Sequence, residues 1–262
     1  MLELYHNDMS VCAQKVRVVL EELDLAWVGH HLKLRGTEQL TPEYLAINPK
    51  GQVPALVDDG FIVVESTVIN EYLADAYGGG KLIPRNAKDR ARMRWWTRQL
   101  DEDIHAAIGT MSQVISFRHQ YLATGAENME RILAAIPDES RREFKRTAFR
   151  TGIENPALPI AVRRANKLLG DMEATLATSE WLAGDMLSLA DVGLIAYVVR
   201  LEQLAMTMMF KDRPNLTAWL ERMKQRQAYT RAMEDWFNPD YLSLSATTGQ
   251  EAFDLVQGFL PA

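Results

Sequence analysis

The chain has 262 residues, of which 47% are hydrophobic and 24% are charged, an ordinary globular composition with enough length for two domains. Its net charge of −6 argues against a nucleic-acid-binding protein, which would carry a basic surface. The single cysteine excludes an internal disulfide and a cysteine-based metal site, and no apolar run approaches the roughly 20 residues that span a bilayer. Because the first ten residues also lack the pattern of a signal peptide, we expect a cytoplasmic protein without membrane or nucleic-acid partners.

The first 78 residues alternate between strand-like and helix-like segments. Strands are predicted over 2–6 and 25–34, and the helix between them, 12–23, has its apolar residues on one face. Two more strands follow within 53–66, joined by a turn at Asp59-Gly60, and then a helix over 66–77 that Ser66 could cap. This order of elements predicts a small α/β sandwich with one parallel strand pair and one antiparallel hairpin.

The remainder of the chain has mainly helical patterns. A glycine-led linker over 79–87 separates it from the first segment. Helices are predicted over 89–122, 158–176, 189–205 and 215–237, and Ser188 with Asp191 forms a capping-box pattern at the start of the third. The polar stretch 125–157 is interpreted as an irregular insertion or a mobile cover over a cleft. The last 20 residues are interpreted as a weakly patterned tail packed on the surface.

Residues 53–66 have features that suit a bound peptide. Pro54 begins a strand although it cannot donate to the ladder, which a cis Val53–Pro54 bond would explain. The N–H and C=O of Val53 would then be free to pair with an added strand. Glu65 and Ser66 lie at a strand-to-helix junction, where the helix N-terminus favours a carboxylate. We therefore expect backbone pairing for a peptide and a socket for its carboxylate in one region.

The segments "SVCAQKVRVVL", "NPKGQVPAL", "VVESTVINEYL" and "SLADV" together resemble the cytosolic glutathione transferases in their order and spacing. The resemblance implies a thioredoxin-like α/β domain over 1–78, a linker over 79–87 and an all-α domain over 88–262. It also implies a homodimer, glutathione as co-substrate in the first domain, and a hydrophobic electrophile bound between the two domains, with no metal.

The resemblance further implies roles for single residues. Val53 would pair with the cysteinyl backbone of glutathione, Pro54 would be the cis proline, and Glu65 with Ser66 would hold the γ-glutamyl end. The residues expected near the glycyl end, or adding charge attraction to the tripeptide, are Gln39, Lys50 and Gln52. The residues expected to line the electrophile site from the first long helix of the second domain are Trp95, Trp96, Met111 and Phe117.

Ser10 and Cys12 are the two candidates for thiol chemistry. Ser10 matches the catalytic position of serine-type transferases, where its hydroxyl would donate to the glutathione sulfur and stabilise the thiolate. The alternative is a helix N-cap without a catalytic role. Cys12 lies about two residues later than the cysteine of cysteine-type members. We expect it to point toward the core, and the alternative is a redox role. Lone histidines such as His105 are interpreted as surface residues.

In its details the sequence is similar to the bacterial β-etherase branch of the family, which uses glutathione to cleave β-aryl ethers derived from lignin. The resemblance includes the "ESTVINEYL" and "RARMRWWTRQLDE" segments and the insertion at 125–157. Three hypotheses follow: a transferase acting on an aromatic or ether electrophile, with detoxification as a related role; a glutathione-dependent reductase or peroxidase working through Cys12; and a non-catalytic binding protein of the same fold.

Overall fold

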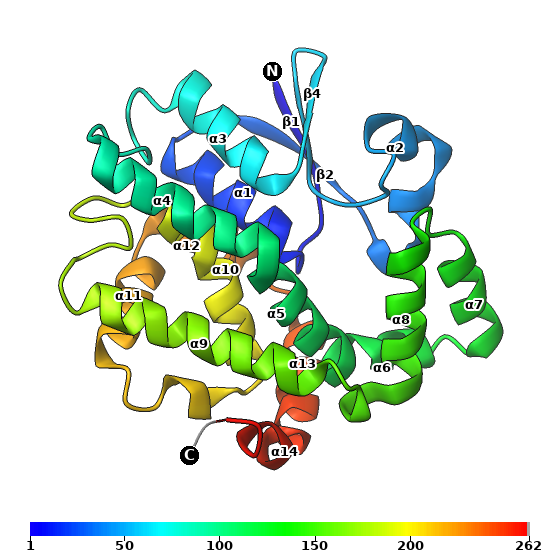
Figure 1. The fold of residues 1–262 in the computed structure, drawn as a ribbon. Helices are drawn as coiled ribbons and strands as arrows, with labels where there is room; N and C mark the ends of the chain where they lie inside the picture. The colour runs from blue at the N-terminus through cyan, green and yellow to red at the C-terminus, as the bar shows by residue number, and fades with distance from the viewer. Residues whose placement is uncertain (261–262) are drawn as a thin grey trace.

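The computed structural model, which describes residues 1–260, places a four-stranded sheet and its helices against a larger group of helices (Figure 1). The strands are β1 Leu2–His6, β2 Trp27–His31, β3 Ala55–Asp58 and β4 Phe61–Val64. The sheet order is β2-β1-β3-β4, with β1 parallel to β2 and antiparallel to β3, and β3 antiparallel to β4. The predicted parallel pair and antiparallel hairpin are therefore confirmed.

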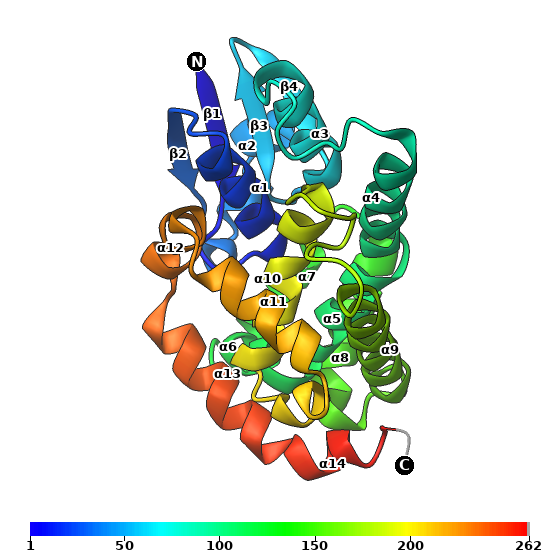
Figure 2. The same ribbon diagram turned by 90° about the vertical axis from the view of Figure 1, so that its left-hand side faces the viewer.

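Three α-helices accompany the sheet: α1 Val11–Glu22, α2 Pro42–Ile47 and α3 Ser66–Tyr77. The helices α1 and α3 pack against each other beside the sheet (Figure 2). The sequence did not indicate α2, although Thr41 caps it by accepting from the Tyr44 N–H, and Pro42 occupies its first turn. One predicted detail is wrong: the residue before α3 is Glu65, with a φ of 69°, and Ser66 is already helical.

Residues 87–257 are predominantly helical, as predicted. The α-helices are α4 Ala87–Gln99, α5 His105–Ser112, α6 Arg118–Leu122, α7 Ala126–Ala134, α8 Glu139–Thr151, α9 Leu158–Leu176, α10 Leu189–Gln203, α11 Pro214–Lys224, α12 Gln227–Ala232, α13 Pro239–Glu251 and α14 Phe253–Gln257. Two π-helical segments, Leu100–Ile104 and Gln113–Phe117, join α4 to α5 and α5 to α6. Among residues 1–260, no helix has the length and apolar character to cross a membrane.

Three expectations for this half need correction. The stretch 125–157 is helical, because α7 and α8 bury their own apolar cluster with α6, made of Tyr121, Ile132, Leu133, Ile136 and Phe149. The predicted helix over 215–237 breaks into α11 and α12. The last segment holds α13 and α14, which pack on the helical group (Figure 2). Helices α7 and α8 are amphipathic, and the apolar face of each packs into the cluster that they form with α6.

Asp191 fastens the central helix α10 to its surroundings. The capping box predicted from the sequence is present, since the Ser188 N–H donates to Asp191 Oδ2 at 3.1 Å and Ser188 caps the helix in return. The same carboxylate accepts from the Leu182 N–H at 3.0 Å and from the Trp219 indole at 2.9 Å. Burial raises the pKa of Asp191, against the effect of these hydrogen bonds. One side chain therefore satisfies buried donors from three segments.

We predict that Asp191→Ala lowers the free energy of unfolding by about 3 kcal/mol, because it leaves several buried N–H groups without an acceptor. The measurement is urea unfolding followed by far-ultraviolet circular dichroism. The matched control is Asp185→Ala, which removes an exposed carboxylate from the preceding loop and should leave the unfolding midpoint unchanged. Equal midpoints for the two variants would contradict the prediction.

Candidate functional site

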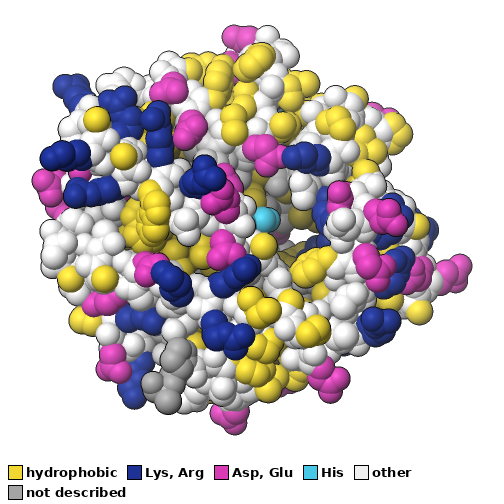
Figure 3. Space-filling model, in the orientation of Figure 1, with side chains coloured by type: hydrophobic (Ala, Val, Ile, Leu, Met, Phe, Trp, Pro, Cys, Tyr) yellow, Lys and Arg dark blue, Asp and Glu magenta, His cyan; other side chains and the backbone are white. Residues whose placement is uncertain are grey.

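Two adjoining cavities open between the sheet with its helices (residues 2–77, the sheet unit) and the remaining helices (residues 87–257, the helical unit). The larger has a volume of about 510 Å³ and the smaller about 200 Å³. Five residues line both: Ser10, Leu34, Arg35, His105 and Lys145. Figure 3 shows the hollow on this face, with a histidine side chain visible near its centre. The combined space suits a peptide-sized ligand and a second small molecule.

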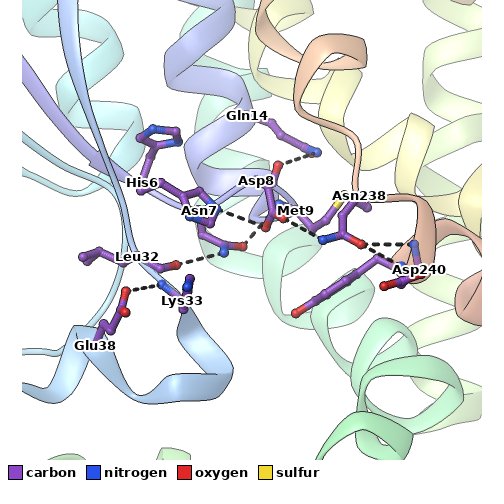
Figure 4. A network of polar contacts seen from close by, with 12 residues as sticks. His6, Asn7, Asp8, Met9, Gln14, Leu32, Lys33, Glu38, Asn238 and Asp240 are labelled. Carbon is purple, nitrogen blue, oxygen red and sulfur yellow. Dashed lines mark hydrogen bonds and ion pairs between the residues drawn. The ribbon is translucent and has the colours of Figure 1, made fainter.

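The loop between β1 and α1 carries Ser10 to the cavities and is held by side-chain hydrogen bonds (Figure 4). Asn7 Nδ2 donates to the Leu32 carbonyl at 3.0 Å, and the Met9 N–H donates to Asp8 Oδ1 at 2.8 Å. Asn238 Nδ2, from the segment before α13, donates to Asp8 Oδ2 at 3.2 Å. The loop is thereby tied both to the sheet unit and to the helical unit.

Two buried arginines bind the carbonyl groups of the same loop. Arg17 of α1 donates to the carbonyls of Asn7 and Asp8 at 3.0 Å each, and Arg200 of α10 donates to the Met9 carbonyl at 2.6 Å. Burial lowers the pKa of Arg17 to about 9 and that of Arg200 to about 10, so both remain cationic at neutral pH. The region next to Ser10 therefore carries fixed positive charge.

Ser10 is the N-cap of α1 and lines both cavities. Its oxygen accepts from the Ala13 N–H at 3.4 Å, so the cap predicted as the alternative reading is present. A hydroxyl can accept and donate at the same time, and the proton of Ser10 is left to donate elsewhere. The cap and a catalytic role are therefore compatible.

Cys12 does not point into the core, contrary to the expectation from the sequence. It is half-buried, lines the larger cavity, and has its Sγ 3.5 Å from His105 Nδ1 and 3.7 Å from the Tyr197 hydroxyl. Burial acts to raise the pKa of the thiol, but the charge and hydrogen bond of His105, together with Lys15 and Tyr197, outweigh it and lower the pKa to about 6. His105 and Tyr197 belong to the helical unit, so the sequence around Cys12 in α1 gave no sign of these contacts.

His105 is also a site residue rather than an unrelated surface histidine. It begins α5, lines both cavities and lies 3.0 Å from the Tyr197 hydroxyl through Nδ1. The charge and hydrogen bond of Cys12 raise its pKa. Cys12 and His105 therefore each stabilise the charged form of the other.

The residues expected to hold glutathione lie around the larger cavity. Those that line it are Gln39, Gln52, Val53, Pro54, Glu65 and Ser66. The Val53–Pro54 bond is cis, as expected. Within residues 1–260 the N–H and C=O of Val53 form no backbone hydrogen bond outside the sheet, and Val53 precedes the first residue of β3. Lys50 does not line the cavity itself, but its Nζ pairs with Glu65 Oε1 at 2.6 Å.

Only one of the four residues expected to bind the electrophile reaches a cavity. Phe117 lines the smaller one. Met111 is fully buried in the core, and Trp96 is buried with its indole N–H donating to the Leu182 carbonyl at 3.0 Å. Trp95 is 47% exposed and lines neither cavity. The structure thus separates these three from the site.

Two π-helical segments lie where this long helical stretch meets the cavities. Each widens one turn of a nearly continuous helix and so rotates the side chains that follow it, a feature that often occurs at functional sites. The cavity-lining residues Asp101, Gln113 and Phe117 lie in these segments, and His105 directly follows the first.

The insertion contributes cationic and aromatic groups that the sequence did not single out. Arg141 and Lys145 of α8 line the larger cavity together with Arg35 and Tyr121. Arg141 donates to the carbonyl of Lys50 at 3.0 Å, which joins α8 to the loop before β3. The insertion therefore covers the cavity, as one interpretation held, but as an ordered helix. Among the described residues, no group of three or more histidine, cysteine or carboxylate side chains could hold a metal ion.

Comparisons with known proteins give the family to which the chain is similar. Residues 9–76 match the family pattern "Glutathione S-transferase, N-terminal domain", and residues 115–227 match "Glutathione S-transferase, C-terminal domain". The chain is 30% identical to Protein LigF of Sphingobium sp. strain SYK-6, over 92% of this chain and 96% of that protein. It is 27% identical to the tetrachloro-p-hydroquinone reductive dehalogenase of Sphingobium chlorophenolicum, over 90% of this chain and 97% of that protein.

Solved structures give the same result. The crystal structure of β-etherase LigF from Sphingobium sp. strain SYK-6 is similar, with a TM-score of 0.81 and 29% sequence identity. The match covers 89% of this chain and 99% of that one. The structure of glutathione transferase F7 from Populus trichocarpa gives a TM-score of 0.69 and 27% identity, over 91% of this chain and 100% of that one.

We predict that the alkylation of Cys12 by iodoacetamide rises with pH around a midpoint near 6, because the thiolate is the reactive form and its pKa is lowered to about 6. An ordinary cysteine would give a midpoint near ~8.5. His105→Phe should move the midpoint upward, since His105 is the main group that favours the thiolate. The control is His119→Phe, which changes a histidine that lines neither cavity. A wild-type midpoint above pH 8 would contradict the prediction.

Proposed function

The chain belongs to the glutathione S-transferase family, an enzyme family with glutathione as co-substrate, and we propose that Ser10 activates the glutathione thiol for attack on a hydrophobic aryl electrophile. The observation that carries the proposal is the position of Ser10 at the N-terminus of α1, facing both cavities at once. A nucleophile bound there would reach a second molecule in the smaller cavity.

The larger cavity supplies groups that match the parts of glutathione. The unpaired backbone of Val53 suits the cysteinyl backbone of the tripeptide. Glu65 and Ser66, with the free N–H groups at the start of α3, suit the amine and carboxylate of the γ-glutamyl end. Gln39 and Gln52 suit the glycyl end, and Lys50 adds positive charge while pairing with Glu65. Glutathione bound in this way would have its cysteinyl sulfur near Ser10.

Activation of the thiol needs only a moderate free energy. A free thiol with a pKa near 8.5 is about 3% thiolate at pH 7, and lowering the pKa by about two units requires about 2.7 kcal/mol of differential stabilisation. A hydrogen bond to a charged group contributes about 1.5–3 kcal/mol, and a helix N-terminus about 0.3–1 kcal/mol. The Ser10 hydroxyl and α1 are placed to supply both contributions, with Arg17 and Arg200 adding positive charge nearby.

We propose β-aryl ethers as the class of electrophile. The similarity to the β-etherase LigF over nearly the full chain supports this choice. The bound thiolate would attack the carbon next to a ketone, forming a C–S bond while the C–O bond breaks. The aryl oxide would leave with the electron pair and take up a proton. The aromatic rings of Phe117 and Tyr241 in the smaller cavity suit an aryl group.

Cys12 supports a second candidate function, a glutathione-dependent thiol reductase. Its lowered pKa and its place in the larger cavity favour attack on the sulfur of a glutathionylated substrate. The substrate thiol would leave and take up a proton, and the enzyme would carry a Cys12–glutathione disulfide. A second glutathione thiolate would then release glutathione disulfide and restore Cys12. The dehalogenase relative, described as reductive, is compatible with this chemistry.

We also propose that the protein is a cytoplasmic homodimer. Its single cysteine is a free thiol, as suits a reducing compartment. Large apolar side chains on β4 and α4 are exposed, namely Phe61, Ile62 and Trp95. Light scattering coupled to size-exclusion chromatography would give about 60 kDa for a dimer, twice the chain mass of 29.7 kDa.

We predict that glutathione bound to the wild-type protein has a thiol pKa near ~6.5, two units below the free value. In Ser10→Ala the pKa should return toward the free value while glutathione still binds. The measurement is an ultraviolet titration of the thiolate band, carried out in a Cys12→Ala background so that the protein thiol does not contribute. If the bound glutathione thiol had the same pKa in Ser10→Ala as in the protein with Ser10, Ser10 would act only as a helix cap.

We predict that the single substitutions Ser10→Ala and Cys12→Ala distinguish the two candidate functions. Ser10→Ala should lower turnover of a model β-aryl ketone ether by about 100-fold, which corresponds to about 2.7 kcal/mol, and Cys12→Ala should lower it by less than about threefold. A reductase would show the reverse, with Cys12→Ala losing disulfide exchange altogether. Release of the phenol and of glutathione disulfide are measured in parallel for all variants.

A further inference from the structure

The smaller cavity carries an excess of positive charge. Three cationic side chains line it, Arg35 from the 3₁₀ turn Leu34–Gly36, Lys145 from α8 and Arg200 from α10. Among the described residues that line this cavity, none is an aspartate or a glutamate. A site for a purely apolar electrophile would not need three converging cations, because each costs free energy to bury.

The three cations have neutral partners. Arg35 donates to the Tyr121 hydroxyl at 2.8 Å and to Gln120 Oε1 at 2.7 Å. Arg200 donates to the Met9 carbonyl and to Gln203 Oε1, and Lys145 donates to the Tyr121 hydroxyl at 3.4 Å. These hydrogen bonds orient the side chains, but they do not neutralise the charge that faces the cavity.

Aromatic rings take the place of carboxylates around these cations. The guanidinium carbons of Arg35 and Arg200 lie 5.3 and 4.9 Å from the centre of the Phe117 ring. Arg35 and Lys145 lie 4.5 and 5.2 Å from the centre of the Tyr121 ring. Ring faces attract cations without cancelling their net charge, so the groups stay available to an anion.

Gln113 provides an independent sign of a missing acceptor. It lies in the second π-helical segment, lines the smaller cavity and is only 8% exposed. Its side-chain Nε2 is buried and has no hydrogen-bond partner among the described residues. A buried N–H donor without an acceptor is unfavourable, and an oxyanion in the cavity would satisfy it.

The nearby carboxylates are engaged elsewhere. Asp8 is held by Asn238 and lies 3.6 Å from His31, and it does not line either cavity. In the larger cavity, Glu65 pairs with Lys50, and Asp101 lies 3.8 Å from the amine of Lys15. Burial, and also the charges of Arg141 and Arg35, lower the pKa of Lys145, so these cations are close enough to repel one another.

We infer that the smaller cavity binds the oxyanion of an acidic aromatic substrate, a carboxylate or phenolate on the aryl electrophile, through Lys145, Arg35, Arg200 and Gln113. The inference rests on the proposed function and narrows its substrate class from hydrophobic electrophiles to anionic ones. The ring of such a substrate would pack on Phe117 and Tyr241. The volume of about 200 Å³ exceeds the ~150 Å³ of an apolar cavity that holds benzene.

The test uses two S-substituted glutathiones that differ in one charge on the benzyl substituent, S-(4-carboxybenzyl)glutathione and S-(4-carbamoylbenzyl)glutathione, whose substituent is neutral and which is called the neutral probe. Each is titrated into the wild-type protein by isothermal calorimetry, so that no turnover is needed. We expect the carboxylate probe to bind at least about tenfold more tightly, the effect of one charge-assisted hydrogen bond. Equal affinity for the two probes would overturn the inference and leave the proposed function intact.

Two substitutions, Lys145→Gln and Arg35→Gln, test whether the preference for the carboxylate probe arises in the smaller cavity. In Lys145→Gln the preference for the carboxylate probe should fall below about threefold, with little change in the affinity for the neutral probe. The control Lys88→Gln removes an exposed lysine that lines neither cavity and should keep the full preference. Arg35→Gln serves as the second variant, and circular dichroism checks that each variant is folded.

The remaining outcomes are also decisive. An equal loss of affinity for both probes in Lys145→Gln would mean that Lys145 binds the glutathione part, and it would overturn the inference. Failure of both probes and of glutathione itself to bind would overturn the proposed function and the inference with it. A retained carboxylate preference in both Lys145→Gln and Arg35→Gln would place the anion elsewhere and contradict the site.

Discussion

The arrangement of the site depends on two buried arginines that hold the carbonyls of residues 7–9 from opposite units. Arg17 of α1 binds the carbonyls of Asn7 and Asp8 and also donates to the Ala232 carbonyl at 2.7 Å, while Arg200 of α10 binds Met9. These contacts use the loop carbonyls in the interior and leave Ser10 and the start of α1 facing the cavities. The same hydrogen bonds join the sheet unit to the helical unit, so the relative position of the two units and the orientation of Ser10 are set together.

The start of α1 offers two places where sulfur chemistry is favoured. The helix N-terminus and the neighbouring arginines stabilise negative charge near Ser10, and His105 with Lys15 stabilises it at Cys12. A glutathione thiolate and a Cys12 thiolate would repel each other in one cavity, so the two cannot both be fully ionised at low cost. If glutathione binds as proposed, ionisation of one sulfur would disfavour ionisation of the other, and Ser10 and His105 would influence which of the two is the nucleophile.

The local sequence patterns were sufficient for most of the fold. Helix α3 and helix α9 have the predicted bounds, and the capping box and the cis Val53–Pro54 bond are present, because each depends on residues close in the chain. The errors arise where distant segments decide the outcome. Cys12 lines the larger cavity beside Tyr197 and His105 of the helical unit, and the two π-helical segments contribute the cavity-lining residues Asp101, Gln113 and Phe117. Neither effect leaves a periodic signal in the sequence.

Helix α8 connects the two halves of the proposed reaction. Arg141 binds the Lys50 carbonyl beside the residues expected to hold glutathione, and Lys145, about one turn further along the same face, lines the smaller cavity. An anion bound by Lys145 would also relieve the repulsion among Lys145, Arg141 and Arg35, which favours keeping α8 in place over the loop. Binding of an acidic electrophile would then stabilise the same helix that contacts the glutathione side. Because binding free energies are reciprocal, glutathione would in turn raise the affinity for the electrophile.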